Sequence, residues 1–160
     1  MKEFNREEFD SLRNAVELEY KNIGNIYNPA LKALIAFNSN GLFHLCYDGS
    51  RHERDKLVQR NKFRYFSQAV NIIKIATTVQ EYRRAICLVS KSNKNRAHKS
   101  SLVEWFTFFS VVSFIKKIRI KVVVRRVGGE SGRFHFWSVM PFWSLRGNER
   151  IISLKEIEDN

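Results

Sequence analysis

The chain has few of the residues that interrupt regular structure or cross-link a fold. Its 160 residues include only two Pro and seven Gly, which argues against long flexible linkers, and we expect a single domain over residues 1–160 with a sizeable core. The two cysteines, Cys46 and Cys87, lie in apolar segments without CxxC spacing. We therefore expect no zinc site and no disulfide framework, but two buried free thiols that fit a reducing cytoplasm.

Long apolar runs and familiar motifs are also missing. The first residues are acidic and lack an apolar stretch, so no secretory signal is expected. The longest apolar run, residues 102–115, contains Glu104 and is shorter than the roughly 20 residues of a membrane helix. The chain has no GxxxxGK[ST], GxGxxG, HExxH or GxSxG motif. We expect a core segment in place of a membrane helix, and no membrane partner.

Acidic residues are scarce, and the positive excess is unevenly distributed. Sixteen Asp and Glu stand against 28 Lys and Arg, which gives a net charge of +12. Residues 1–50 carry a net −2, residues 51–99 a net +10, and residues 116–133 a net +6. A polyanion is the natural partner of such a surface, with RNA ahead of DNA. A basic protein that is merely soluble is the alternative.

The first half of the chain reads mainly as helix. Asn5 and Glu8 form a capping box for a helix over residues 6–21, which Gly24 and Pro29 end. Residues 33–37 and 42–47 read as a hairpin with an Asn-Gly turn, although residues 31–37 fit a short helix equally well. Ser50 and Glu53 predict the start of a basic helix from residue 51 to about 77, and residues 78–85 predict another short helix.

The second half contains a predicted hairpin, residues 117–127 and 133–140, joined by a five-residue loop rich in glycine. Both arms alternate as strands with one buried face do. If Val127 lies opposite Arg133, the core-facing pairs are Val124 with Phe136, Val122 with Ser138, and Ile120 with Met140. Pro141 is expected to end the second strand, and residues 103–109 fit either a buried strand or a buried helix.

These elements predict an α+β fold in which helices of the first half pack on a C-terminal antiparallel sheet. The helical, basic segment is expected over residues 1–90 and the sheet over about 100–145. A polar tail over 146–160 has one possible short strand at residues 151–152.

The other face of the predicted hairpin carries Lys121, Arg125, His135 and Trp137. Cations, an imidazole and an indole suit a surface that grips a phosphodiester backbone and stacks a base. Carboxylates are scarce in the basic middle of the chain, which argues against a two-metal nuclease. RNA cleavage without metal needs only a base, an acid and cations, because the 2′-hydroxyl is the nucleophile.

Each candidate residue also has a plain structural explanation. His135 is the best-placed catalytic residue, or a histidine with one hydrogen bond; His44 is a second acid or base, or a histidine at the core edge. Trp137 stacks a base, worth about 1–3 kcal/mol, or is covered by a helix. Further phosphate contacts are expected from Arg51, Lys56, Lys62, Lys121 and Arg133, unless ion pairs such as Arg51–Asp55 make the helix an ordinary solvated surface.

The closing strand, His135-Phe-Trp-Ser-Val-Met-Pro141, resembles that of the phage-type members of the barnase–EndoU–colicin–RelE superfamily. The resemblance covers mainly residues 117–141, with a second block at residues 43–51 and 53–56. It implies a small metal-independent ribonuclease, often a toxin, with His135 in the catalytic strand and Ser138 beside it. It also implies Arg125 and Lys121 on phosphate and His44 or Arg51 from the earlier block. The register above puts Ser138 on the face opposite His135, so only a bulge would bring both to one phosphate.

The sequence therefore predicts a toxin-like, metal-independent endoribonuclease that needs no cofactor and cleaves RNA by 2′-hydroxyl attack. The alternative is a nucleic-acid-binding protein without catalytic activity that uses the same basic face. An acidic antitoxin or immunity protein is a further expected partner.

Overall fold

The computed structural model describes residues 5–91, 98–113, 117–146 and 149–152. Within them the chain forms four α-helices and a seven-stranded sheet. The helices are α1 (Arg6–Ile23), α2 (Ser39–Cys46), α3 (Lys56–Arg64) and α4 (Phe66–Ile75). The strands are β1 (Asn25–Asn28), β2 (Ala33–Ala36), β3 (Glu81–Lys91), β4 (His98–Ser113), β5 (Lys117–Val127), β6 (Phe134–Arg146) and β7 (Glu149–Ile152).

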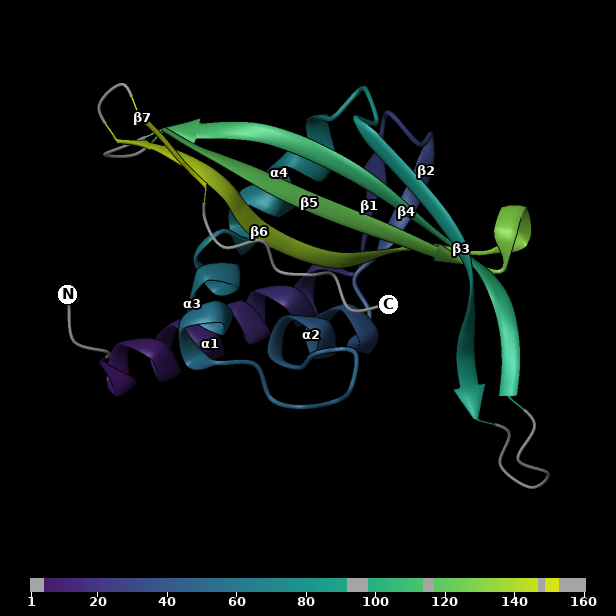
Figure 1. Ribbon diagram of the computed structural model, residues 1–160, viewed down its shortest axis with the longest axis horizontal. Helices are drawn as coiled ribbons and strands as arrows, with labels where there is room; N and C mark the ends of the chain where they lie inside the picture. The colour runs from purple at the N-terminus through teal and green to yellow at the C-terminus, as the bar shows by residue number, and fades with distance from the viewer. Residues whose placement is uncertain (1–4, 92–97, 114–116, 147–148, 153–160) are drawn as a thin grey trace.

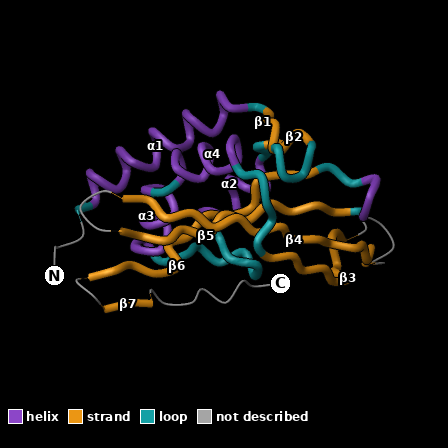
Figure 2. Tube along the Cα trace, turned by 90° about the horizontal axis from the view of Figure 1, so that it is seen from above, coloured by secondary structure: helices purple, strands orange, loops and turns teal. Residues whose placement is uncertain are grey.

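The sheet has the order β1-β2-β6-β5-β4-β3, with β7 paired to β6; α4 packs on one face of it, and α2 and α3 lie beside β6 (Figures 1 and 2). The predicted α+β class, with helices in the first half, is confirmed. The sheet is larger than predicted, because it begins at β3 and also recruits β1 and β2. It is mixed, since β2 runs parallel to β6. No helix in the described part of the chain is both long and apolar enough to cross a membrane.

The central strand β5 divides the buried residues into two groups. Ile118, Ile120, Val122 and Val124 belong to the main core cluster, whereas Val123 belongs to a second cluster with Val103 and Trp105. Since neighbouring residues of a strand point to opposite faces, the two clusters lie on opposite sides of the sheet. We call the side of Val122 and Val124 the helix face and the side of Val123 the pocket face.

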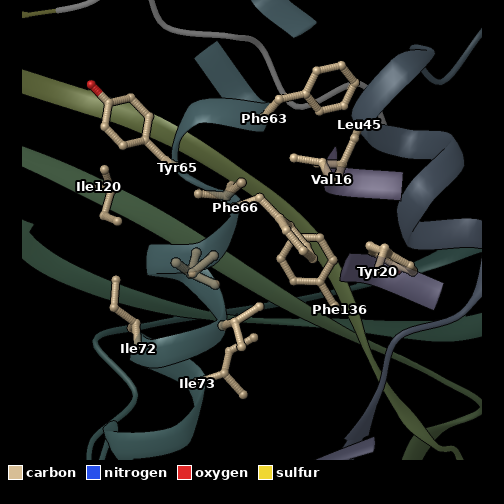
Figure 3. Close-up of a cluster of buried hydrophobic side chains, with 14 of the residues drawn as sticks. Val16, Tyr20, Leu45, Phe63, Tyr65, Phe66, Ile72, Ile73, Ile120 and Phe136 are labelled. Atoms are coloured by element: carbon tan, nitrogen blue, oxygen red, sulfur yellow. The ribbon is translucent and has the colours of Figure 1, made fainter. Parts of the chain in front are cut away.

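The helix face packs against aromatic side chains of the helices. Phe136 lies 5.7 Å from Phe66 and 6.0 Å from Tyr20, measured between ring centroids, and is stacked on Phe37 at 5.1 Å. Figure 3 shows Phe136 of the sheet beside Phe66 and Tyr20 of the helices. Ring pairs at these distances add to the stabilisation from apolar burial.

Two bulges in β6 change the predicted hairpin register. Val124 faces Phe136 as predicted, but Trp137 is an additional residue, so Val123 faces Ser138 and Val122 faces Val139. The predicted pairs Val122–Ser138 and Ile120–Met140 are therefore wrong. A bulge leaves one residue of its strand unpaired, and alternation in the sequence does not mark the place.

The second bulge lies near Pro141. Ile120 faces Pro141 and Arg119 faces Trp143, which leaves Phe142 as the additional residue. The prediction that Pro141 ends the strand is wrong, because β6 continues to Arg146. Strands accommodate proline at bulges, where the missing N–H costs no ladder hydrogen bond. β7 contains the predicted short strand at residues 151–152.

The first helix is confirmed, but the predicted hairpin at residues 33–47 is wrong. The Asn5 side chain accepts hydrogen bonds from the backbone of Glu7 and Glu8, and Gly24 ends α1 at φ 66°. β2 pairs with β1, and the Asn38 side chain accepts from the backbone N–H groups of residues 40 and 41 to begin α2. Asparagine favours helix caps and turns alike, so the same letters fit both structures.

Two further helix predictions are wrong. The basic helix begins at Lys56, where the Asp55 side chain accepts from the backbone of Leu57, because Glu53 is held in a bridge with Tyr47. Residues 81–85 belong to β3, and residues 103–109 belong to β4, which decides the open alternative in favour of a strand. The residues at the start of β3 fit a helix cap equally well, but pairing with β4 stabilises them as a strand.

Candidate functional site

A pocket of about 480 Å³ lies between α2, the loop after it and the pocket face of the sheet. Strands β3 to β6 form its floor, and α2 forms one wall. The lining residues are Asn38, Asn40, Phe43, His44, Asp48, Gly49, Arg51, Cys87, Leu88, Val89, Trp105, Arg125, Val127, His135 and Trp137. The pocket therefore joins residues that are up to 99 positions apart in the sequence, from Asn38 to Trp137.

Gly41 sets how closely α2 approaches the floor of this pocket. A Cβ atom at this position would overlap the backbone oxygen of Phe136 and the hydroxyl of Tyr20. Only glycine permits so close an approach of a helix to a strand. The glycine that resembles a turn residue in the sequence is thus required for packing.

Three of the four residues predicted on one hairpin face lie together in the pocket. Arg125 of β5 is the register partner of His135 of β6, and the first bulge leaves Trp137 on the same side. Lys121 lies farther along β5, where its ammonium is 3.4 Å from a carboxylate oxygen of Glu81. Lys121 does not line the pocket.

Trp137 is the centre of a stack within the pocket. The His44 ring lies 4.2 Å from the indole at an interplanar angle of 19°, and Cζ of Arg125 lies 4.2 Å from it. The His135 ring meets the indole edge-on at 5.9 Å. A guanidinium over an indole contributes about 0.5–2 kcal/mol, more when it is shielded from water. The stack therefore fixes the positions of the Arg125 guanidinium and of the two imidazole rings.

Two polar atoms in this stack are buried without a hydrogen-bond partner. They are Nε of Arg125 and Nε2 of His135, which lie on paired positions of neighbouring strands. Leaving such a group unpaired in the interior costs about 1–3 kcal/mol, and more when the group is charged. Both residues line the same pocket, which makes them the first candidates for contact with a ligand there.

Both histidines are held in the neutral form. Burial, and then the charge of Arg125, lower the pKa of His135 to about 4, while a hydrogen bond to the backbone of Arg133 acts in the opposite direction. Burial lowers the pKa of His44 to about 2, with smaller effects from Lys62, Arg54 and Arg125. Burial disfavours the charged imidazolium, and nearby cations disfavour it further. At neutral pH the pocket is thus positive through its cations alone.

Arg54 holds the end of α2 in place. Its Nε donates to the backbone oxygens of His44, at 3.1 Å, and Tyr47, at 2.9 Å, and its Nη2 lies 3.4 Å from Nε2 of His44. The loop it anchors brings Arg51 to the rim, with φ 65°. Few residues other than glycine adopt this conformation, and such strain is concentrated at functional sites. No separate signal in the sequence marks Arg54, because it falls within the predicted basic helix.

Besides Lys121, four predicted site residues lie outside the pocket. Nζ of Lys62 donates to Oγ of Ser138 at 2.8 Å, and both side chains are almost completely buried. Lys56 pairs with Glu53 and lies 5.2 Å from the ring of Phe9 in α1. Arg133 is exposed at the start of the closing strand. The first bulge moves Ser138 to the face opposite the predicted one, where it pairs with Val123. The Ser138 hydroxyl nevertheless bonds to Lys62 of α3, and Ser138 does not line the pocket in which a phosphate contact was expected.

Sequence reasoning did not identify Asn40, Phe43 and Trp105 as pocket residues. Asn40 and Phe43 were assigned to a hairpin, and Trp105 to an apolar run. A helical reading of residues 39–46 would place residues 40, 43 and 44 on one helix surface, since residues three and four apart are neighbours there.

Among the residues that the structure describes, no three His, Cys, Asp or Glu side chains gather closely enough to hold a metal ion. The one pocket carboxylate, Asp48, instead accepts a hydrogen bond from the backbone of His52 at 2.8 Å. No protein-family model, curated protein or solved structure matches this chain.

Proposed function

We propose that the protein binds single-stranded RNA at this pocket and cleaves it without a metal ion. The observation that carries the proposal is that Arg125 and His135, paired residues that line a cationic pocket, each have a buried nitrogen atom without a hydrogen-bond partner. A phosphate accepts from the guanidinium, and a ribose hydroxyl next to that phosphate meets the imidazole. Together with Arg51 at the rim, these groups match one nucleotide unit.

The reaction needs a base, a proton donor for the leaving oxygen, and charge stabilisation. Nε2 of His135 takes the proton of the 2′-hydroxyl, and the 2′ oxygen forms a bond to phosphorus. The bond from phosphorus to the 5′ oxygen breaks, and the 5′ oxygen takes a proton from water. Arg125 stabilises the negative charge that develops on the phosphorus oxygens. The products are a 2′,3′-cyclic phosphate and a 5′-hydroxyl end.

Two other features support this proposal. The closing strand resembles that of the barnase–EndoU–colicin–RelE ribonucleases, and its His135 is the residue that lies in the pocket. The thiols of Cys46 and Cys87 are free, which fits cytoplasmic RNA as the substrate.

A non-catalytic RNA-binding protein is the second candidate. The pKa values of about 4 and about 2 leave no imidazolium in the pocket at neutral pH to protonate the leaving oxygen. Binding needs only the cations and the cavity, so this observation favours it.

The test is incubation of the purified protein with a labelled single-stranded RNA in EDTA, beside His135→Ala and Arg125→Gln. We expect cleavage by the wild type, cleavage lost in His135→Ala with binding retained, and binding weakened in Arg125→Gln. His52→Ala is the matched control, because its side chain is exposed and does not line the pocket. A DNA strand of the same sequence should be bound but not cut.

If the RNA stays intact in every reaction but its binding depends on Arg125, only the second candidate, a non-catalytic RNA-binding protein, would remain. Absence of any RNA binding would overturn both.

A further inference from the structure

The indole rings of the pocket are already occupied by protein groups. Trp137 is stacked with His44 and Arg125, both at 4.2 Å. Trp105 is almost completely buried and has the guanidinium of Arg83 4.5 Å from its ring. Stacking of a base on an indole would therefore require the protein to break its own contacts. The predicted role of Trp137 as a stacking platform does not fit this arrangement.

Phe43 presents an aromatic ring that is open to the solvent. It lines the pocket and is 43% exposed. Its ring is backed by Tyr47, with 4.4 Å between centroids and an interplanar angle of 14°. A large exposed aromatic side chain beside a cationic site, supported from behind by a second ring, has the form of a platform for a flat ligand.

A neighbouring amide is placed to contact the edge of such a ligand. Asn40 precedes Phe43 by three residues on α2, is exposed and lines the same pocket. The oxygen of the Asn38 side chain already accepts two backbone hydrogen bonds at the start of α2. The amide of Asn40 has a donor and an acceptor to offer to a base edge.

Another aromatic pair on the pocket face is less suited. Phe109 and Phe142 lie 5.3 Å apart, but the guanidinium of Arg119 is 4.1 Å from the ring of Phe109 and 5.5 Å from that of Phe142. This pair also does not line the pocket.

We infer that Phe43 stacks one unpaired base of the bound strand, with Asn40 at the base edge and the adjoining phosphate at Arg125. This inference rests on the proposed RNA binding and names the part of RNA that the pocket takes. It assigns base recognition to α2 and phosphate recognition to the sheet. Gly41, which keeps α2 close to β6, holds the two parts at a fixed separation.

The experiment measures binding of a short 2′-O-methyl RNA, which cannot be cleaved by 2′-oxygen attack, by fluorescence anisotropy. Phe43→Ala should weaken binding by about 5- to 150-fold, the loss that corresponds to one stacked base. Phe43→Trp should retain the affinity, because it keeps a ring. Tyr27→Ala is the matched control, since Tyr27 is also an exposed aromatic residue but lies on β1 outside the pocket.

A second strand, with abasic sites throughout, separates stacking from other effects of the substitution. Wild type and Phe43→Ala should bind this strand equally. Asn40→Ala should reduce the difference in affinity among oligomers of A, C and U.

Binding of the base-containing strand by Phe43→Ala within twofold of wild type would overturn the inference. If Arg125→Gln still weakened binding in that case, the proposed function would stand. A wild-type protein that binds neither strand would overturn both.

Discussion

The two faces of the sheet bury side chains of the same strands but leave them in different chemical states. On the helix face, Val122, Val124 and Phe136 pack against apolar rings. On the pocket face, half-buried Arg125 and buried His135 lie against Trp137, and each has a buried nitrogen atom without a partner. Adjacent positions such as Val124 and Arg125 thus differ in role: the first packs in the core, and the second is the one that we propose for binding. A buried residue is a candidate for function when its polar atoms lack partners, not simply because it is buried.

The largest effect is expected from the helix face. Phe136→Ala should lower the free energy of unfolding by about 3–5 kcal/mol, because it removes a fully buried ring and leaves a cavity. Urea denaturation measures the change. Tyr27→Ala, at an exposed ring, should change it by no more than about 0.5 kcal/mol. Equal effects of the two variants would contradict the assignment of Phe136 to the core.

The next effect concerns the contact between α2 and the sheet. Gly41→Ala should cost about 1–3 kcal/mol, because the added methyl group overlaps Phe136 and Tyr20. It should also displace His44 from Trp137, which tryptophan fluorescence can follow. Gly24→Ala is a control for glycine replacement, since a Cβ there meets no atom within 4 Å although its φ of 66° is strained. An unchanged fluorescence spectrum in a destabilised Gly41→Ala would argue against movement of α2.

The pocket face should determine how stability depends on pH. The folded pKa values of His135 and His44, about 4 and about 2, lie below the unfolded value of about 6.5. The unfolded state therefore binds more protons, so stability is fully present above pH 6.5 and falls as the pH drops below it. Between pH 7 and pH 5 each histidine should account for a loss of about 2 kcal/mol.

Urea denaturation at pH 7 and pH 5 measures this dependence. His44→Gln and His135→Gln should each remove about half of the loss. Substitutions on the helix face, such as Val122→Ala, should lower stability equally at both pH values. A pH dependence that is unaffected by both histidine substitutions would show that other groups control it.

The smallest effect distinguishes two neighbouring arginines. Arg125→Gln should weaken RNA binding by about tenfold and reduce the slope of log K against log salt by about 0.7, as expected for one lost phosphate contact with a single strand. Arg126→Gln should change neither quantity, because Arg126 is held by Glu104 at 2.6 Å. Binding measured from low to high salt tests both variants. Equal losses of RNA affinity in the two variants would mean that binding does not distinguish the pocket face from the helix face.

The sequence predicts best the elements whose signals are local. The first helix follows from Asn5 and Gly24, and the β5–β6 hairpin follows from alternation, which also placed Arg125 beside His135. The sequence predicts poorly where one residue type suits two structures, as Asn38 suits a turn and a helix cap. Bulges, the burial of Lys62 and the position of Phe43 in the pocket depend on contacts between distant segments. No local pattern contains that information.

The first bulge of β6 changes whether even-numbered residues pair with even- or odd-numbered residues of β5, and the second bulge restores the original relation. Before Trp137, even-numbered residues such as Phe136 oppose even-numbered residues of β5; between the bulges, Val139 opposes Val122; after Phe142, Ser144 opposes Ile118. Only the short stretch between the bulges has its parity inverted. Deleting Trp137 alone would therefore remove the first bulge and keep the pairs of Ser138 with Val123 and Val139 with Val122, while the pocket would lose its indole.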